Sequence, residues 1–102
     1  MSRLKRLPPI HPGEILSEEF LEPLGMSMNK LADELHVPAN RITQIVEGRR
    51  SITGETALRL ARYFGTSAEL WLGMQKDYDL QVARDEFEVE VKRQVQPRGK
   101  AA

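Results

Sequence analysis

The chain has 102 residues, of which 40% are hydrophobic and 29% are charged, and its formal net charge is zero. This composition predicts one globular domain with a small core and excludes both a wholly disordered chain and a uniformly basic nucleic-acid binder. The absence of cysteine excludes disulfides and thiolate metal sites and favours a cytoplasmic protein. No apolar run reaches the roughly 20 residues that span a bilayer, and the first residues do not have the apolar core of a secretory signal.

The first elements in chain order are an arm and a helix. Residues 1–10 have no periodicity and contain two adjacent prolines and three cations, which predicts a flexible basic arm. A helix is expected from Pro12 to Glu22, with Pro12 in its first turn and Pro23 as its stop. His11 has no partner at a metal-ligand spacing, so we interpret it as a residue of the helix start and not as a metal ligand or catalytic base.

The segment 27–50 predicts two short helices separated by a tight turn. Ser27 is a suitable N-cap for the first helix, and Pro38 fits at or just before the start of the second. Apolar residues recur at helical spacing on one face of each helix: Leu31, Ala32 and Leu35, then Ile42, Ile45 and Val46. This pattern is typical of a helix-turn-helix, and a plain helical hairpin with a polar face is the alternative.

The outer face of the second helix carries side chains that can read DNA bases. Asn and Gln can bind adenine bidentately, Arg can bind guanine, and Ala or Thr can contact a thymine methyl group. The predicted base-reading residues are Ala39, Asn40, Arg41, Thr43 and Gln44. Polar and basic residues that could contact the phosphate backbone flank the two helices: Ser27, Asn29, Lys30, Arg49, Arg50 and Ser51. We predict no catalytic residue, no metal site and no cofactor.

Two positions depart from the usual repressor pattern. Met28 stands where the first helix of such motifs often has a glutamine that contacts phosphate and braces a base-reading residue. His36 stands where the turn often has a glycine. A positive φ at this histidine would cost about 1 kcal/mol, which a domain of this size can tolerate.

Two further helices are expected after the motif. Thr53 can cap a helix that runs to about Phe64 and is closed by Gly65. The next helix starts after Ser67 and includes Trp71, which we expect in the core. Polar-tipped residues on this helix fit either a dimer seam or plain packing: Gln75, Tyr78 and Asp79.

The chain changes character beyond residue 83. Apolar and charged residues alternate from Phe87 to Val91, which is typical of a strand. A lone strand would need a second chain to pair with, so the alternative is a helix of weak propensity. The basic tail from Gln96, with its proline and glycine, is expected to be disordered.

Charge is distributed in blocks. Residues 11–36 are acidic apart from Lys30, and residues 67–90 are again mostly acidic. Between them, residues 37–62 carry five arginines and two glutamates. The pattern favours a basic, DNA-facing band between two acidic surfaces and therefore two different partners, with ordinary solvated helix faces as the alternative.

Motifs on both sides of the two short helices resemble a known family. The motifs are His11-Pro12-Gly13-Glu14, Pro23-Leu24-Gly25, and Trp71-Leu72 followed by Gln75, Tyr78 and Asp79. They are similar to those of the HigA antitoxins of plasmid-maintenance toxin–antitoxin modules, relatives of which are called virulence-associated protein I. The resemblance covers about residues 7–84 and implies an all-α, five-helix domain of the lambda-repressor-like helix-turn-helix class. That domain would span residues 11–84, between the basic arm and a C-terminal segment, 85–102, for dimer or toxin contact.

The resemblance implies a function with two partners. It implies an antitoxin that binds operator DNA as a homodimer, represses its own operon and neutralises a cognate HigB-like toxin that cleaves mRNA. A stand-alone phage-type repressor without a toxin partner is the alternative. A small hydrolase or nuclease has no support, because two isolated histidines and no cysteine supply no catalytic set.

Overall fold

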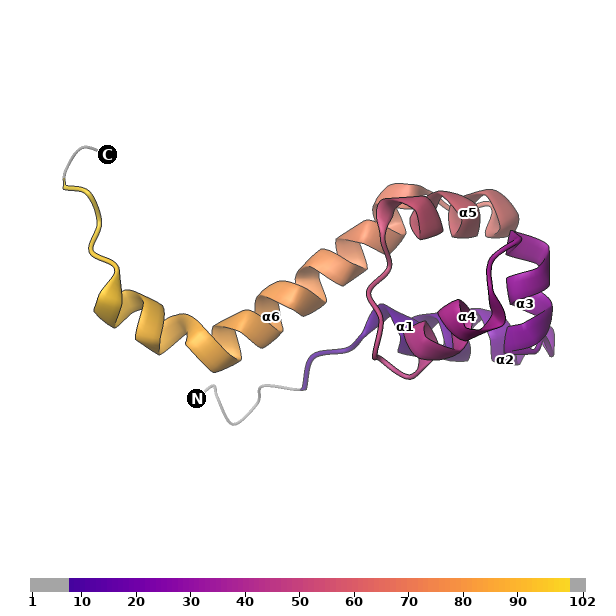
Figure 1. Cartoon of the computed structure of the whole chain (residues 1–102), viewed down its shortest axis with the longest axis horizontal. Helices are drawn as coiled ribbons and strands as arrows, with labels where there is room; N and C mark the ends of the chain where they lie inside the picture. The colour runs from indigo at the N-terminus through magenta and orange to yellow at the C-terminus, as the bar shows by residue number, and fades with distance from the viewer. Residues whose placement is uncertain (1–7, 100–102) are drawn as a thin grey trace.

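The computed structural model describes residues 8–99, which form five helices and no strand (Figure 1). The predicted all-α class is therefore confirmed for the described part of the chain. Of the predicted basic arm, residues 1–7 lie outside the described residues. The first helix consists of three consecutive segments, and the elements are α1 (Pro12–Ile15), η2 (Leu16–Leu21), α2 (Glu22–Leu24), α3 (Met28–Leu35), α4 (Ala39–Val46), α5 (Gly54–Phe64) and α6 (Ala68–Gln94).

The first helix continues past the proline that was expected to stop it. Pro23 lies inside the helix, which ends at Gly25 with a left-handed φ of 62°. In the preceding π-helical segment η2, the Glu22 N–H donates to the carbonyl of Ser17, five residues back. A proline ring in a regular α-helix collides with the carbonyl four residues earlier, and the wider π-helical turn relieves this collision. The prediction that Pro23 is a stop was therefore wrong.

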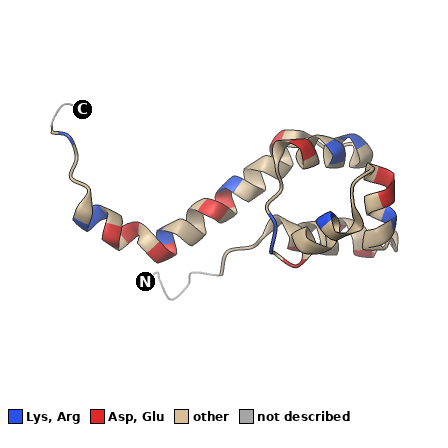
Figure 2. Ribbon diagram, viewed as in Figure 1, with Lys and Arg blue, Asp and Glu red and all other residues tan. Residues whose placement is uncertain are grey.

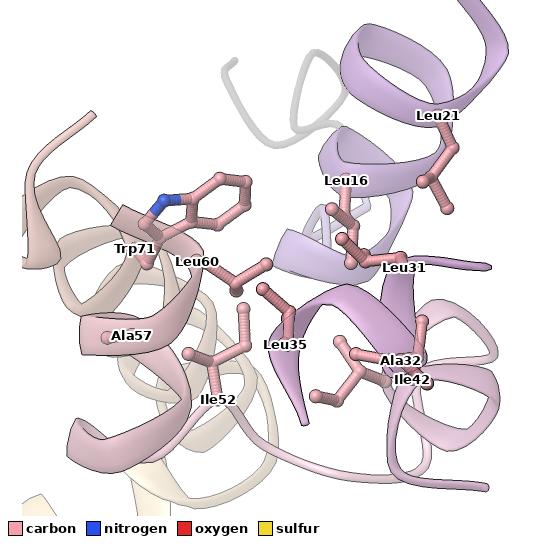
Figure 3. Close-up of a cluster of buried hydrophobic side chains, with 11 residues drawn as sticks. Leu16, Leu21, Leu31, Ala32, Leu35, Ile42, Ile52, Ala57, Leu60 and Trp71 are labelled. Atoms are coloured by element: carbon pink, nitrogen blue, oxygen red, sulfur yellow. The ribbon is translucent and has the colours of Figure 1, made fainter. Parts of the chain in front are cut away.

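The core lies where the five helices meet. Figure 3 shows its side chains converging from the first helix, α3, α4, α5 and the start of α6. Phe20 packs against both Phe64 and Trp71, with ring centroids 4.8 and 5.1 Å apart. Trp71 is fully buried, as predicted, and its indole N–H donates to Thr66 Oγ1 at 2.8 Å. The buried hydrophobic residues are Leu16, Leu21, Leu31, Ala32, Leu35, Ile42, Ile45, Ile52, Ala57, Leu60 and Trp71.

The helices α5 and α6 begin at their predicted caps, and α5 also ends at its predicted glycine. The Thr53 and Ser67 hydroxyls accept the Thr56 and Leu70 N–H groups at 3.4 and 3.0 Å. Gly65 closes α5 with a φ of 74°. These caps satisfy backbone groups that have no partner within the helix.

Packing, and not a dimer seam, accounts for Gln75. Its side chain is buried, and its Oε1 accepts the Ile52 N–H at 2.8 Å while its Nε2 donates to Asp79 Oδ1 at 3.0 Å. Tyr78 packs edge-on against His11, with ring centroids 4.8 Å apart. Gln75 thus ties α6 to the loop before α5 and stabilises the globular part of the molecule, residues 11–75.

The alternating segment at the C-terminus is helical. Residues 87–91 belong to α6, so the helix alternative is confirmed and the strand alternative is wrong. A helix satisfies its backbone hydrogen bonds within one chain, whereas a lone strand cannot. Every residue of the outer part of α6, residues 83–94, is exposed, and Figure 1 shows α6 extending away from the other helices. None of the helices in residues 8–99 is long and apolar enough to cross a membrane.

Candidate nucleic-acid interface

Helices α3 and α4 form a helix-turn-helix that is shaped by its caps and its turn. The Ser27 Oγ accepts the Lys30 N–H at 3.0 Å and caps α3. His36 ends α3 with φ 60° and ψ 46°, so the position where glycine is usual does adopt the left-handed conformation. An L side chain in this conformation costs about 1–2 kcal/mol. Pro38 then takes an extended conformation and precedes the first residue of α4, as predicted.

The first helix supports α4 from behind through a glycine. A Cβ atom on Gly13 would lie 1.8 Å from the carbonyl oxygen of Ile45, so only glycine permits this approach. His11 caps the same helix, because its Nδ1 accepts the Gly13 N–H at 2.9 Å. His11 is 6% exposed, and burial lowers its pKa against the opposing effects of Asp79 and Glu14. The predicted role of His11 at the helix start is confirmed. The close contact of Gly13 with α4 was not predicted, although the glycine in the His-Pro-Gly motif could have indicated it.

The structure leaves all five predicted base-reading residues accessible, although to different extents. Ala39 and Asn40 are exposed in the first turn of α4. Arg41, Thr43 and Gln44 are half-buried. The Thr43 Oγ1 donates to the Ala39 carbonyl at 3.3 Å, so its hydroxyl proton is used within the helix and its methyl group is the part suited to a base.

Arg41 is held by a carboxylate from α5. Its Nη1 lies 3.4 Å from Glu55 Oε1, and the other oxygen of Glu55 accepts from Arg59 Nε and Nη2 at 3.1 and 3.0 Å. Arg59 also donates from Nη1 to the Leu35 carbonyl at 2.9 Å. Hydrogen bonds from Arg59, and then the charges of Arg59 and Arg41, lower the pKa of the Glu55 carboxyl. This chain of contacts joins α3, α4 and α5 around the predicted reading helix.

No sequence pattern predicts the whole chain of contacts around Glu55. The spacing of Glu55 and Arg59, four residues apart on α5, is the one signal that could have found part of it. Arg41 and Leu35 are 14 and 24 residues away from their respective partners, Glu55 and Arg59. Such contacts depend on how the helices pack.

The six residues predicted to contact phosphate are all exposed and lie in two groups. Ser27, Asn29 and Lys30 surround the N-terminus of α3, where the helix dipole favours an anion. Arg49, Arg50 and Ser51 follow α4, and the two arginines have different partners. The Arg49 Nε donates to Glu47 Oε1 at 3.0 Å, whereas the Arg50 Nε donates to Gln44 Oε1 at 2.8 Å.

Charge in the predicted basic band is partly neutralised by pairing. Of its five arginines, Arg41 and Arg59 pair with Glu55, and Arg49 pairs with Glu47. Lys30 pairs with Glu34 on α3 at 3.0 Å, which raises the pKa of the lysine. Because these residues are paired, contact with phosphate would require the exposed pairs to exchange partners, at the small cost that is usual for surface ion pairs.

Outside the band, α6 also carries both signs of charge. Figure 2 shows acidic and basic residues interleaved along this helix.

Residues 8–99 contain no group of three His, Cys, Asp or Glu side chains that could hold a metal ion. The features that the helix-turn-helix does provide are α4 with its accessible polar side chains, the basic loop after it and the N-terminus of α3. This set of groups can bind a nucleic-acid duplex through its phosphates and its major groove.

Comparison with known proteins identifies the same region. A family model described as helix-turn-helix matches residues 18–71, which include all of α3 and α4. Virulence-associated protein I of Dichelobacter nodosus is 55% identical over 80 residues, which are 78% of this chain and 74% of that protein. Antitoxin HigA-1 of Vibrio cholerae is 35% identical over 92 residues, which are 90% of this chain and 86% of that protein. The structure of Pseudomonas aeruginosa antitoxin HigA with the higBA promoter has a TM-score of 0.85 at 40% identity, covering 87% of this chain and 97% of that chain.

Proposed function

The chain belongs to the HigA-type helix-turn-helix antitoxins, which are DNA-binding regulators and not enzymes, and on this basis we propose its function. It binds operator DNA as a homodimer, represses its own operon and neutralises a cognate HigB-like toxin that cleaves mRNA. The observation that carries the proposal is the accessible side of α4, where Asn40, Arg41 and Gln44 stand beside the exposed Arg49 and Arg50. The relative from Pseudomonas aeruginosa, of the same fold, was solved with promoter DNA, which supports a DNA partner for this chain.

DNA binding follows from the two short helices. In this mode α4 lies in the major groove, while the N-terminus of α3 and the residues Arg49 and Ser51 face the phosphates. Fluorescence anisotropy tests this binding mode with two duplexes, one from upstream of the protein's own gene and one of random sequence. Gln44→Ala should cost about 1–3 kcal/mol on the specific duplex and little on the random one. Arg49→Ala should weaken binding to both and reduce the log–log salt slope by about 0.9. Equal losses on both duplexes for Gln44→Ala would show that α4 is not the reading element.

A homodimer is proposed because one helix-turn-helix reads few base pairs. Two units on half-sites about 34 Å apart, or a multiple of that, supply the missing specificity. The outer part of α6 is the proposed seam, since Ala83, Phe87 and Val91 follow one another at intervals of four residues and line an apolar groove of about 310 Å³. Phe87 is 55% exposed and Val91 is 50% exposed, and their alignment with Ala83 gives one apolar strip that a partner could bury.

Charge complementarity supports an antiparallel pairing of two α6 helices. Arg84 and Glu90 lie three residues before and three residues after Phe87. A two-fold axis at Phe87 would therefore place Arg84 of one protomer at the same level of the seam as Glu90 of its partner, so that opposite charges meet at both ends of the seam. The pairing also places Ala83 opposite Val91, a small residue opposite a larger one.

Toxin neutralisation requires a surface that is clear of the DNA-binding face. A toxin that binds RNA should have a basic surface, so its inhibitor needs an acidic one. The first helix presents the exposed residues Glu14, Glu18, Glu19 and Glu22, and the outer part of α6 presents Asp85, Glu86, Glu88 and Glu90. Residues 87–91 are helical, so they would meet the toxin as part of a helix and not as a strand that pairs with a second chain.

Titration of the purified toxin with two full-length variants, Glu18→Lys/Glu19→Lys and Glu86→Lys/Glu88→Lys, tests which surface is used. The variant that fails to inhibit identifies the surface. If both variants inhibit like the parent, neither surface binds the toxin. If the parent itself does not bind, the chain is a stand-alone phage-type repressor.

A further inference from the structure

Arg50 contacts the side chain of a predicted base-reading residue and not a carboxylate. Its Nε donates to Gln44 Oε1 at 2.8 Å, across six residues of sequence. The neighbouring Arg49 donates instead to Glu47. Both arginines are exposed in the loop after α4. Two adjacent side chains of equal charge therefore have different roles in the structure, although the sequence alone assigned both of them to phosphate.

The contact with Arg50 determines which way the Gln44 amide faces. A guanidinium group has only donors, so the atom of Gln44 that faces it must be the carbonyl oxygen. The NH₂ group of the amide then points away from Arg50. Among the described residues this NH₂ group has no protein acceptor, so it is available to a ligand. Gln44 is half-buried on α4, which restricts the rotamers that its side chain can adopt.

We propose that Arg50 is a positioning residue that makes Gln44 a reader of guanine. With its oxygen bound by Arg50, Gln44 presents its two NH₂ donors, next to the remaining N–H groups of the guanidinium. The major-groove edge of guanine has two acceptors, N7 and O6, which complement such an array of donors. Adenine presents the N7 acceptor and an N6 donor, and that donor would face a cationic group that cannot accept a hydrogen bond. The inference rests on the proposed binding of DNA by α4 and replaces the expectation that Gln44 binds adenine bidentately.

The same geometry predicts what happens without the arginine. If the guanidinium is removed, Gln44 Oε1 becomes free and the amide can rotate to present one acceptor and one donor side by side. That arrangement matches the N6 and N7 atoms of adenine. Loss of Arg50 should therefore change which base is preferred, whereas loss of a phosphate contact lowers affinity for every sequence alike.

Selection from a randomised duplex library tests the proposal and does not require the operator sequence. The full-length parent, Gln44→Ala, Arg50→Met and Arg49→Met are each used, and circular dichroism checks that all four have the same helix content. The DNA position that Gln44 reads is the one at which the Gln44→Ala motif loses the base preference of the parent motif. The parent should select guanine there. Arg50→Met should shift that preference towards adenine by roughly tenfold, the size of one base contact, and leave the other positions unchanged. Arg49→Met is the matched control, since it loses the same charge and should keep the guanine.

Several outcomes would overturn the proposal. If Arg50→Met weakens all positions equally, as Arg49→Met should, then Arg50 is a phosphate contact. Adenine at the Gln44 position in the parent motif, or a Gln44→Ala motif identical to that of the parent, would also refute it. A folded parent that enriches no motif at all would instead refute the proposed reading of DNA by α4, and it would therefore also refute the positioning role of Arg50.

Discussion

The globular part and the outer part of α6 belong to one continuous stretch of chain but are stabilised in different ways. In the globular part, side chains such as Leu31, Ile42 and Trp71 are buried, and caps such as His11 and Thr53 satisfy the ends of helices. In the outer part of α6 every residue is exposed, and the helix is supported by its own backbone hydrogen bonds and by local pairs such as Glu90 with Arg93. Burial therefore stabilises the first region, whereas helix propensity and, in the proposed dimer, contact with a partner stabilise the second.

If the proposed dimer forms through the outer part of α6, folding and assembly depend on separate residues. Helix α6 begins as a core element with Trp71 and Gln75 and continues as an arm whose apolar residues, Phe87 and Val91, contact nothing in the core. Changes in the globular part should therefore affect the free energy of unfolding. Changes in the outer part of α6 should affect association and leave the fold intact.

The largest effect is expected from Gly13→Ala in the globular part. The added Cβ would lie 1.8 Å from a backbone oxygen of α4, so α1 and α4 would have to separate. We expect a loss of about 3 kcal/mol or more in the free energy of unfolding, measured by urea denaturation at one protein concentration. Gly54→Ala is the matched control, because no atom lies within 4 Å of its added Cβ and it should be neutral. A stable Gly13→Ala protein would contradict the close approach of the two helices.

The next largest effect should appear in assembly. Replacing Phe87 and Val91 together with aspartate should weaken the dimer by at least about 2 kcal/mol and leave the unfolding of the globular part unchanged. Sedimentation at several concentrations measures the first quantity, and fluorescence of the single tryptophan, Trp71, measures the second. Val89→Asp is the control, because in a helix Val89 lies about 200° around the axis from Phe87. If Val89→Asp were equally damaging, the segment would be pairing as a strand.

A smaller effect is expected from acidification, and it should be confined to the globular part. Burial lowers the pKa of His11 below its ordinary value of 6.5, so the unfolded chain binds a proton more readily than the folded chain does. The stability contributed by neutral His11 is therefore complete above pH 6.5 and is lost as the pH falls towards the folded-state pKa. Protonation of Nδ1 would also remove the acceptor that caps the Gly13 N–H. The loss should not exceed about 2 kcal/mol, the size of a helix cap.

The variant His11→Asn tests this origin of the pH dependence. Asparagine can cap a helix but does not titrate, so the decline in Trp71-detected stability between about pH 7 and pH 5 should become smaller. An unchanged pH profile would show that the decline comes from other groups.

The smallest effect is expected for Glu55→Gln. This change releases Arg41 from its carboxylate partner and removes a negative charge near the proposed DNA-binding face. Binding to random duplex should become tighter, and the log–log salt slope should steepen by up to about 0.9. Asp77→Asn removes the same charge from an exposed pair with Lys76, on a part of α6 outside the proposed dimer seam, and should leave the slope unchanged. Equal effects of the two variants would show that net charge alone is responsible.

Local interactions could be predicted from the amino-acid sequence. Ser27, Pro38, Thr53 and Ser67 mark helix starts in the structure as they do in the sequence, because a cap involves residues only two or three positions apart. The periodicity of Leu31, Leu35, Ile42 and Ile45 likewise identified the buried faces, because burial of one face imposes a helical period on the sequence. The family motifs and the two short helices together located the candidate interface before any contact was known.

Contacts between elements could be established only from the folded chain. Three contacts of this kind are the approach of Gly13 to Ile45, the link from Leu35 through Arg59 and Glu55 to Arg41, and the contact of Arg50 with Gln44. Apart from Glu55 and Arg59, which are four residues apart on α5, the residues that they join have no characteristic spacing. The conformation of residues 87–91 was ambiguous for a related reason. Short alternating segments fit either a strand or a helix, and the choice depends on whether a neighbouring strand exists. Sequence patterns record backbone hydrogen bonding and burial within one element, whereas side-chain partners depend on the distances between elements, which packing of the core sets.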